Sequence, residues 1–317
     1  MEKKQLGATG IDISPVVFGG NVFGWTADEK QSFDLLDAWV DLGFDAIDTA
    51  DVYSAWAEGN SGGESETIIG KWLAKNPSKR DQVKIFTKVG SKLGEDRGGL
   101  SARWVKQGLE DSLKRLQTDY VDLYFTHWPD DSVGYEETLT AFDAAKKEGK
   151  IRSVGASNLD LCQLEKAQAA AASAGVQPYQ VLQPEYNLYD RDKLEGGLGA
   201  YCETHDIGVI TYFSLASGFL SGKYRSEADL SGKKRGDFVK KYLGDKGKKV
   251  LAALDEVSET VRASQAEVAI AWLIHKSFVT APIASATSGS QLESLRKAAE
   301  LKLDANAMTR LDASGVA

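Results

Sequence analysis

Residues 43–54, with the sequence GFDAIDTADVYS, decide the fold and carry the first candidate functional residues. Their first half, residues 44–50, is a short apolar run of the kind that forms a strand buried on both faces of a parallel sheet. Asp48 lies near the carboxyl end of this run, and Tyr53 follows five residues later. A carboxylate and a phenol at a buried strand end predict that this end faces a functional site.

Seven more runs of this kind follow the same pattern, at residues 15–20, 83–89, 120–127, 151–157, 179–184, 208–213 and 279–285. Amphipathic helical stretches alternate with them. Eight βα repeats without a break in composition predict a single (β/α)8 TIM barrel domain over residues 1–317, and residues 5–14 predict a short hairpin that closes its floor. The alternative is an open doubly wound sheet, but FGGNVFG at residues 18–24 does not fit the GxGxxG spacing typical of that fold.

Composition limits the classes of partner. A net charge of −8 argues against nucleic acid and anionic membranes, and no run approaches the roughly 18 apolar residues of a membrane span. Two cysteines are too few for a disulfide framework, and the three histidines lie in separate segments, so no metal site is expected. We expect a cytoplasmic protein that binds a small molecule, as a monomer or weak homo-oligomer.

Two further strand ends add Lys88, in KIFTKVG, and His127, in YFTHWP. In a barrel, these would converge with Asp48 and Tyr53 on one mouth. A free tyrosine has a pKa of about 10, and we expect the Lys88 ammonium to lower it while Asp48 keeps Lys88 charged. His127 could hydrogen-bond the same carbonyl oxygen. The set predicts a general acid for a carbonyl, with hydride from a cofactor, although each residue alone is compatible with a structural role at the rim.

The later strand ends carry amides and hydroxyls. Ser157, Asn158 and Gln183 could together bind a nicotinamide carboxamide, and Tyr212 offers a face for ring stacking. Hydrogen bonding between strands inside the rim is the structural alternative.

A long basic loop is expected after the seventh strand. Residues 223–249 contain ten positive and four negative charges, in a chain whose net charge is negative. Phosphate sites of barrels are typically built there, so a pyrophosphate or a ribose 2′-phosphate is a candidate ligand, and the loop could close as a lid. An ordinary solvated loop is the alternative.

Three tryptophans, Trp25, Trp56 and Trp128, fall just beyond the first, second and fourth strands. They predict a wall for apolar, aromatic or sugar-like carbonyl substrates, with simple packing as the alternative.

These motifs together resemble the aldo-keto reductase family over nearly the whole chain. The resemblance is carried by GFDAIDTADVYS, TKVG, DLYFTHWPD, VGASN, QPEYNLYDR, SGFLSGKY and AIAWLIHK, and is greater to the bacterial group related to potassium-channel β subunits. It implies a (β/α)8 barrel that reduces aldehydes or ketones with NADP(H), with NAD(H) left open. Tyr53 would be the acid, tuned by Lys88 and Asp48, and His127 would position the substrate.

The resemblance also places the cofactor along the mouth. The implied contacts, besides Ser157, Asn158, Gln183 and Tyr212, are Gly20, Asn21, Asp48, Phe213, Ser214, Leu215, Ala216, Ser217, Gly218, Lys223, Arg235, Ser285, Thr287 and Gln291. The sequence departs from the family pattern after the eighth strand, where Ser294-Leu295 replaces a Glu-Asn pair and Thr287 replaces a basic residue. Arg235 could bind the 2′-phosphate instead.

Two other functions remain open at this stage. Lys88 at a barrel strand end could be the nucleophile of a Schiff-base aldolase. A cofactor-binding regulatory subunit with negligible turnover is the other alternative.

Overall fold

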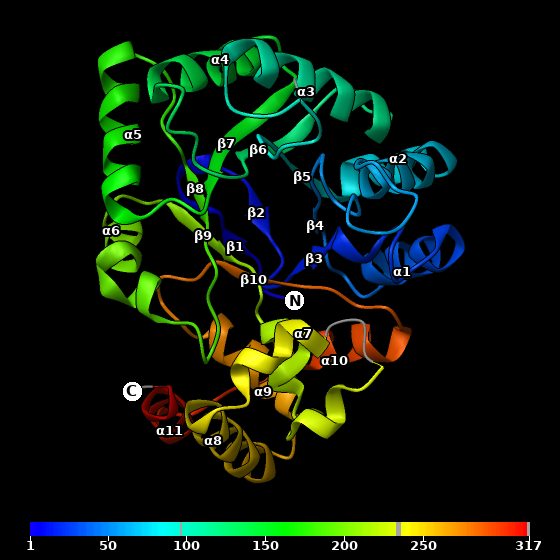
Figure 1. The fold of residues 1–317 in the computed structure, drawn as a ribbon, viewed down its shortest axis with the longest axis vertical. Coiled ribbons are helices and arrows are strands. Elements are labelled where there is room, and N and C mark those ends of the chain that lie inside the picture. Colours follow the sequence, from blue (N-terminus) through cyan, green and yellow to red (C-terminus); the bar gives the residue numbers. More distant parts are fainter. Residues whose placement is uncertain (96, 233–235, 316–317) are drawn as a thin grey trace.

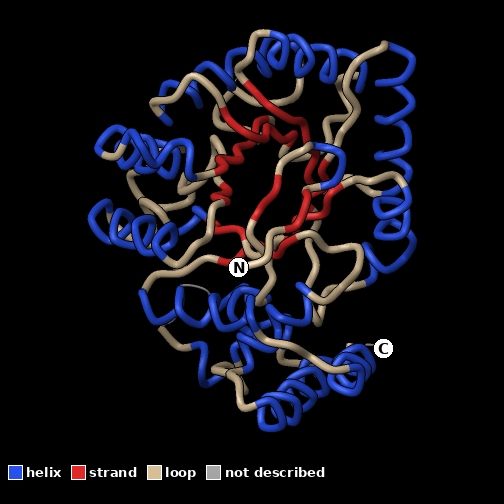
Figure 2. Tube along the Cα trace, turned by 180° about the vertical axis from the view of Figure 1, so that it is seen from behind, coloured by secondary structure: helices blue, strands red, loops and turns tan. Residues whose placement is uncertain are grey.

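A parallel β-barrel forms the centre of the molecule. The computed structural model describes residues 1–95, 97–232 and 236–315, and within them eight strands close in the order β10-β3-β4-β5-β6-β7-β8-β9. Figure 2 shows this ring of strands surrounded by helices. The strands are β3 (Val17–Gly19), β4 (Ala46–Asp48), β5 (Lys84–Val89), β6 (Val121–Thr126), β7 (Ile151–Ser157), β8 (Val181–Gln183), β9 (Gly208–Thr211) and β10 (Ala281–Ala284). The predicted (β/α)8 fold is confirmed, with most strands shorter than their apolar runs.

Helices follow each strand and cover the outside of the barrel (Figure 1). These are α1 (Glu29–Asp41), α2 (Glu64–Lys75), α3 (Ala102–Leu116), α4 (Tyr135–Lys147), α5 (Leu161–Ala174), α6 (Gly199–Thr204), α9 (Gln265–Ile274) and α10 (Gly289–Glu300). Two more helices, α8 (Asp245–Val261) and α11 (Ala305–Ser314), pack against each other beyond this ring, at the lower edge of Figure 1. No described helix is long and apolar enough to span a membrane.

Local sequence explains where the helices begin and end. Ser101 caps α3 by accepting a hydrogen bond from the Trp104 amide, and Asp160 forms a capping box with Gln163 at the start of α5. Gly175 ends α5 with a left-handed φ of 66°, which glycine adopts without a steric cost. These signals fix helix boundaries independently of tertiary packing.

The N-terminal hairpin closes one end of the barrel. It pairs β1 (Lys4–Gln5) with β2 (Asp12–Ile13), as expected from the sequence. Leu6 and Ile13 are fully buried in the cluster that fills the barrel interior, which also contains Phe86 and Phe125. Because the hairpin fills this end, the functional side chains lie at the opposite, carboxyl end of the strands.

The basic segment is only partly a loop. Its last residues, from Asp245 onward, already belong to α8, and the short helix α7 (Gly236–Val239) lies within it. The expectation of a loop through residue 249 is therefore wrong for residues 245–249, which form the start of α8. Three of its basic residues, 233–235, including the candidate Arg235, lie outside the described residues.

Candidate active site

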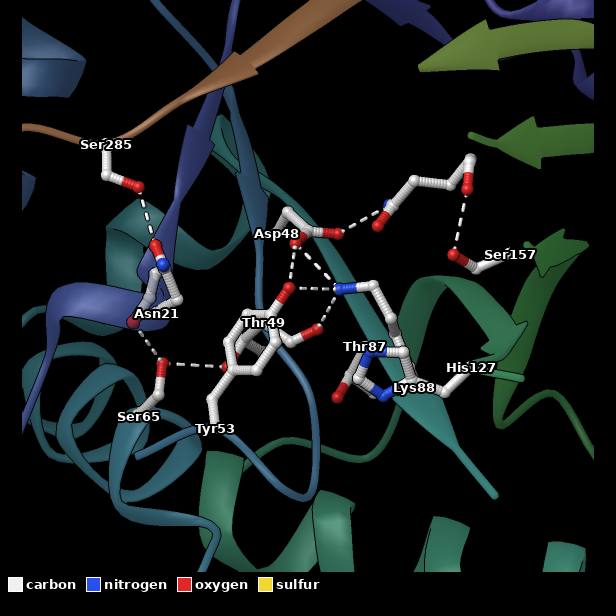
Figure 3. A network of polar contacts seen from close by, with 12 residues as sticks. Asn21, Asp48, Thr49, Tyr53, Ser65, Thr87, Lys88, His127, Ser157 and Ser285 are labelled. Carbon is white, nitrogen blue, oxygen red and sulfur yellow. Dashed lines mark hydrogen bonds and ion pairs between the residues drawn. The ribbon is translucent and has the colours of Figure 1, made fainter. Parts of the chain in front are cut away.

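Four side chains meet at the carboxyl ends of β4, β5 and β6 (Figure 3). Lys88 Nζ lies 2.7 Å from Asp48 Oδ2, 2.8 Å from the Thr49 carbonyl oxygen and 2.8 Å from Tyr53 Oη. The Tyr53 hydroxyl donates in turn to Asp48 Oδ2 over 3.0 Å. The His127 ring centroid lies 6.0 Å from that of Tyr53. The structure therefore brings together all four residues that the sequence singled out.

The register of the sheet causes this convergence. Asp48, on β4, is paired with Phe86, and Lys88 follows Phe86 by two residues on β5, so the two polar side chains lie on neighbouring strands and point to the same face of the sheet. Asp48 and Lys88 are both completely buried. An ion pair in such a place is maintained only with further hydrogen bonds, and the three acceptors around Lys88 Nζ use all its donors.

The pKa of Tyr53 corrects one expectation. Burial, followed by the Asp48 carboxylate, raises the pKa of Tyr53 well above its usual value. We had expected Lys88 to lower it, but the phenol is desolvated and donates a hydrogen bond to an anion, and both favour the protonated form. Tyr53 therefore carries its proton over the neutral range.

The other two titratable groups are shifted by the same burial. Burial lowers the pKa of Lys88, and the Asp48 carboxylate opposes that effect. Burial and the positive charge of Lys88 lower the pKa of His127 well below its usual range, so its imidazole is neutral. Ser91 Oγ lies 2.9 Å from His127 Nδ1. If Ser91 donates to Nδ1, the proton of the neutral ring is on Nε2, where it can be donated to a ligand.

The amides and hydroxyls of β7 to β9 are already bonded to each other. Ser157 Oγ donates to the Gln183 carbonyl oxygen over 2.8 Å, and Tyr212 Oη donates to Asn158 Oδ1 over 2.7 Å. Asn158 Nδ2 donates to Ser157 Oγ and to the His127 carbonyl oxygen, and Gln183 Nε2 reaches across the mouth to Asp48 Oδ1 at 2.8 Å. The hydrogen bonding between strands that we named as the alternative is therefore present.

The remaining candidates lie around the same mouth. Ser285 Oγ donates to Asn21 Oδ1 over 2.6 Å, which joins the ends of β10 and β3. Gln291 Oε1 accepts from the Thr287 amide over 2.7 Å at the start of α10. After β9, the backbone of residues 213 and 216–218 has positive φ, and Ser214 is buried while Phe213 is largely exposed. Gly20 is so close to the Asp48 carbonyl oxygen that a Cβ there would lie 2.9 Å from it.

The tryptophans line the outer side of the site. The ring centroid of Trp56 lies 6.1 Å from that of Tyr53 and 5.7 Å from that of Trp25, and Trp128 lies parallel to His127 at 6.0 Å. Trp56 and Trp128 are each 51% exposed, which is unusual for the largest apolar side chain. Trp56 thus lies next to the Tyr53 ring and Trp128 next to that of His127, and their role as a wall for substrates stays a prediction.

Sequence reasoning missed several neighbours of the site. Ser91, three residues after Lys88, was not considered, although it continues the same TKVGS motif. Asp51, Glu66, Thr87 and Arg115 form a buried polar cluster behind Lys88, and no spacing rule connects them. No group of three or more metal-ligating side chains occurs in the described residues.

Comparison with known proteins agrees with the fold. The model of the Aldo/keto reductase family matches residues 15–315, so the chain belongs to this family. It is 33% identical to "Uncharacterized oxidoreductase YrpG" of Bacillus subtilis (strain 168), over 98% of this chain and 95% of that protein. It is 34% identical to "Aldo-keto reductase YhdN" of the same organism, over 93% of this chain and 88% of that protein.

A plant protein is similar over the same length. "Probable voltage-gated potassium channel subunit beta" of Arabidopsis thaliana is 31% identical, over 95% of this chain and 92% of that protein. The relatives therefore include proteins named as oxidoreductases and proteins named as channel subunits. Family membership and the oxidoreductase names support oxidoreductase activity in general for this chain.

Proposed function

We propose that the protein is an NAD(P)H-dependent reductase of aldehydes and ketones. The observation that carries the proposal is the Tyr53 hydroxyl, which is 2.8 Å from the Lys88 ammonium and donates to Asp48, on a ring that lies 6.1 Å from that of Trp56. In the reduction, the carbonyl carbon gains a hydride and the oxygen gains the Tyr53 proton, which leaves an alcohol and oxidised nicotinamide. The reverse reaction uses the same groups.

Each of the four side chains has its own role in proton transfer. Tyr53 gives its proton to the carbonyl oxygen, and Lys88 stabilises the phenolate that forms because its ammonium already contacts Oη. Asp48 keeps Lys88 oriented through the 2.7 Å ion pair. Neutral His127 donates from Nε2 to the same carbonyl oxygen and holds it near Tyr53. Asp48 and Lys88 are completely buried, so the interactions between them are strong.

The residues at the mouth also fit a nicotinamide. Gln183 and Asn158 donate their N–H groups within the rim, and Asn158 Oδ1 also accepts from Tyr212 Oη, so what they offer to a ligand is acceptor capacity on Gln183 Oε1 and the second lone pair of Asn158 Oδ1. A carboxamide NH₂ needs such acceptors. Bound NAD(P)H would supply the hydride, and the ring of Tyr212 would stack on the nicotinamide.

The segment after β9 fits the diphosphate. Residues 216–218 form a tight turn with positive φ, and because the Ala216 and Gly218 amides already donate to the Phe213 and Leu215 carbonyl oxygens, the attraction for a diphosphate comes from a nearby cation. The Lys223 ammonium is close by, since a Cβ on Gly218 would lie 3.5 Å from its Nζ. After the eighth strand, where Thr287 replaces the family's basic residue, the nearby Arg296 on α10 is already paired with Glu293 and Glu300. We therefore assign the 2′-phosphate of NADP(H) to the basic segment, residues 223–249. NAD(H) remains the alternative cofactor.

The aromatic wall suggests the kind of substrate. Trp25, Trp56 and Trp128 present flat apolar faces beside Tyr53 and His127. Such faces bind aromatic rings and the apolar faces of sugars. We propose aromatic or sugar-like aldehydes and ketones as substrates.

A Schiff-base aldolase is not supported. All three donors of Lys88 are used by Asp48, Thr49 and Tyr53, so its amine is not free for attack on a carbonyl. A regulatory subunit without turnover would have no need for a protonated phenol beside an open aromatic wall.

The direct test follows NADPH oxidation at 340 nm with a panel of aldehydes, for the wild type and for Tyr53→Phe. We expect turnover in the wild type and a loss of about 100-fold or more in the variant, because general acid catalysis contributes on that order. Tyr201→Phe, on α6 away from the mouth, is the matched control and should retain activity. Tight NADPH binding without turnover in the wild type would instead favour a regulatory subunit.

A further inference from the structure

Asp51 is a buried carboxyl group that the reaction described above does not use. It is 2% exposed, and neither of its carboxyl oxygens has a well-formed hydrogen bond. An unpaired carboxylate in such a place costs several kcal/mol, so its position requires an explanation. Its backbone is tied to the catalytic strand, since the Asp51 amide donates to the Lys88 carbonyl oxygen over 3.3 Å.

Charged groups surround Asp51 from three elements. Glu66, on α2, is fully buried, accepts from the Thr87 hydroxyl and lies 2.6 Å from Arg115 Nε, on α3. The positive charge of Lys88, on β5, lowers the pKa of Asp51 from the side of the catalytic site. A further titratable neighbour is the buried phenol of Tyr124, on β6, whose pKa is raised by burial and then by the charge of Asp51.

The charges of this cluster balance only when Asp51 holds a proton. Two cations, Lys88 and Arg115, face two paired carboxylates, Asp48 and Glu66. Asp51 is the third acid and has no cation of its own. Burial and the negative charge of Glu66 raise the pKa of Asp51 to about 8, although Arg115, the Val52 amide and Lys88 oppose the shift. Near neutral pH the cluster is therefore uncharged as a whole.

We propose that Asp51 is a positioning residue of the reductase site that acts through Lys88, and that the proton on its buried carboxyl controls how readily Tyr53 releases its own. When Asp51 loses this proton, an anion lies behind Lys88 and a second anion on Tyr53 becomes less favourable. The ion pair with Asp48 opposes the loss of charge from Lys88, although burial lowers the pKa of Lys88. The inference rests on the proposed reductase activity, and it predicts that reduction slows as the pH rises through the range where Asp51 ionises.

The first measurement is the single-turnover rate of NADPH oxidation, which isolates the chemical step, at about pH 6.5 and about pH 9.5. We expect the wild-type rate to fall several-fold between the two pH values. In Asp51→Asn, most of this decrease should be absent. If the loss came from deprotonation of Lys88, removing the nearby Asp51 anion would lower the pKa of Lys88 and move the loss to lower pH. A change in that direction, or no change, overturns the proposal.

The second measurement does not need turnover. An acid whose pKa is higher in the folded protein than in the unfolded chain takes up a proton on folding, so the free energy of unfolding falls as pH rises between the two pKa values. For Asp51 this window runs from the ordinary aspartate range to about 8. The free energy of unfolding of Asp51→Asn, relative to that of the wild type, should therefore rise with pH across this window and stay constant above it. A difference that does not vary with pH overturns the proposal.

Asp122→Asn is the matched control. Asp122 is also a buried acid, but it accepts hydrogen bonds from the Ile85 amide and from Arg80, at the amino ends of the strands. Its replacement should leave the ratio of the single-turnover rates at the two pH values unchanged. Asp51→Ser gives a second neutral variant if the asparagine does not fold, with the same expected directions. A wild type without turnover would refute the proposed reductase activity, and the stability measurement would still report whether Asp51 holds its proton.

Discussion

Asp48, Tyr53 and Lys88, three of the proposed catalytic residues, each have more than one hydrogen-bond partner, and Tyr53 shows why this matters. Its hydroxyl accepts from Lys88 and donates to Asp48, so the phenol cannot rotate without breaking two hydrogen bonds. The sequence predicted these three residues and their meeting place because strand ends of a barrel share one mouth. It gave the wrong direction for the pKa of Tyr53, since desolvation and the 3.0 Å contact with Asp48 exist only in the folded protein.

Ser91 allows a prediction at the same scale. Ser91→Ala removes the hydrogen bond to His127 Nδ1, so the ring no longer has a fixed tautomer or orientation. A single hydrogen bond contributes about 1 kcal/mol, so we expect kcat/KM for an aldehyde to fall by about fivefold. Ser91→Thr keeps the hydroxyl and should restore most of the activity, and equal losses in both variants would contradict the assignment.

The packing of α2 on α3 positions polar side chains outside the candidate active site. Gly70 lies where the two helices touch, and a Cβ there would lie 2.0 Å from the Arg115 carbonyl oxygen. This close approach places Glu66 and Arg115 behind β5. The sequence predicted α3 and its apolar stripe, but helical periodicity does not show which residues of two helices face each other, so the polar cluster could not be predicted.

Gly70→Ala tests that packing. In an isolated helix the change would be favourable by roughly 1 kcal/mol, but overpacking a close contact costs typically about 1–3 kcal/mol. Because the contact is with backbone, which cannot move aside, we expect a net loss in the free energy of unfolding, measured by urea denaturation. Gly289→Ala, at the first residue of α10, where a Cβ meets nothing within 4 Å, is the control and should not lower stability.

At the scale of the whole molecule, charge is distributed unevenly. The chain has a net charge of −8, yet residues 223–249 carry ten basic side chains against four acidic ones. An acidic protein repels phosphate groups on average, so a basic segment beside the mouth gives an anionic cofactor a local attraction. The charge of the segment was predictable by counting residues. Its path was not, because α8 begins within it and residues 233–235 lie outside the described part.

Cofactor affinity should therefore depend on salt. We expect the Kd of NADPH, measured by quenching of tryptophan fluorescence, to rise more steeply than that of NADH between about 0.05 and 0.5 M NaCl, because the 2′-phosphate adds charge that salt screens. Lys223→Gln should weaken both cofactors, since Lys223 lies beside the expected diphosphate position. Equal salt dependence for the two cofactors would exclude the basic segment as the 2′-phosphate site.

The closure of the barrel between β10 and β3 also limits how the protein can associate. A sheet with a free edge can recruit a strand from another chain, which is a common route to aggregation and to peptide capture. The eight barrel strands have no such edge, and the strands of the hairpin β1–β2 are only two residues long. The described barrel strands therefore offer no edge to a second chain, and variants designed to create or disrupt an assembly belong on the described helices and loops.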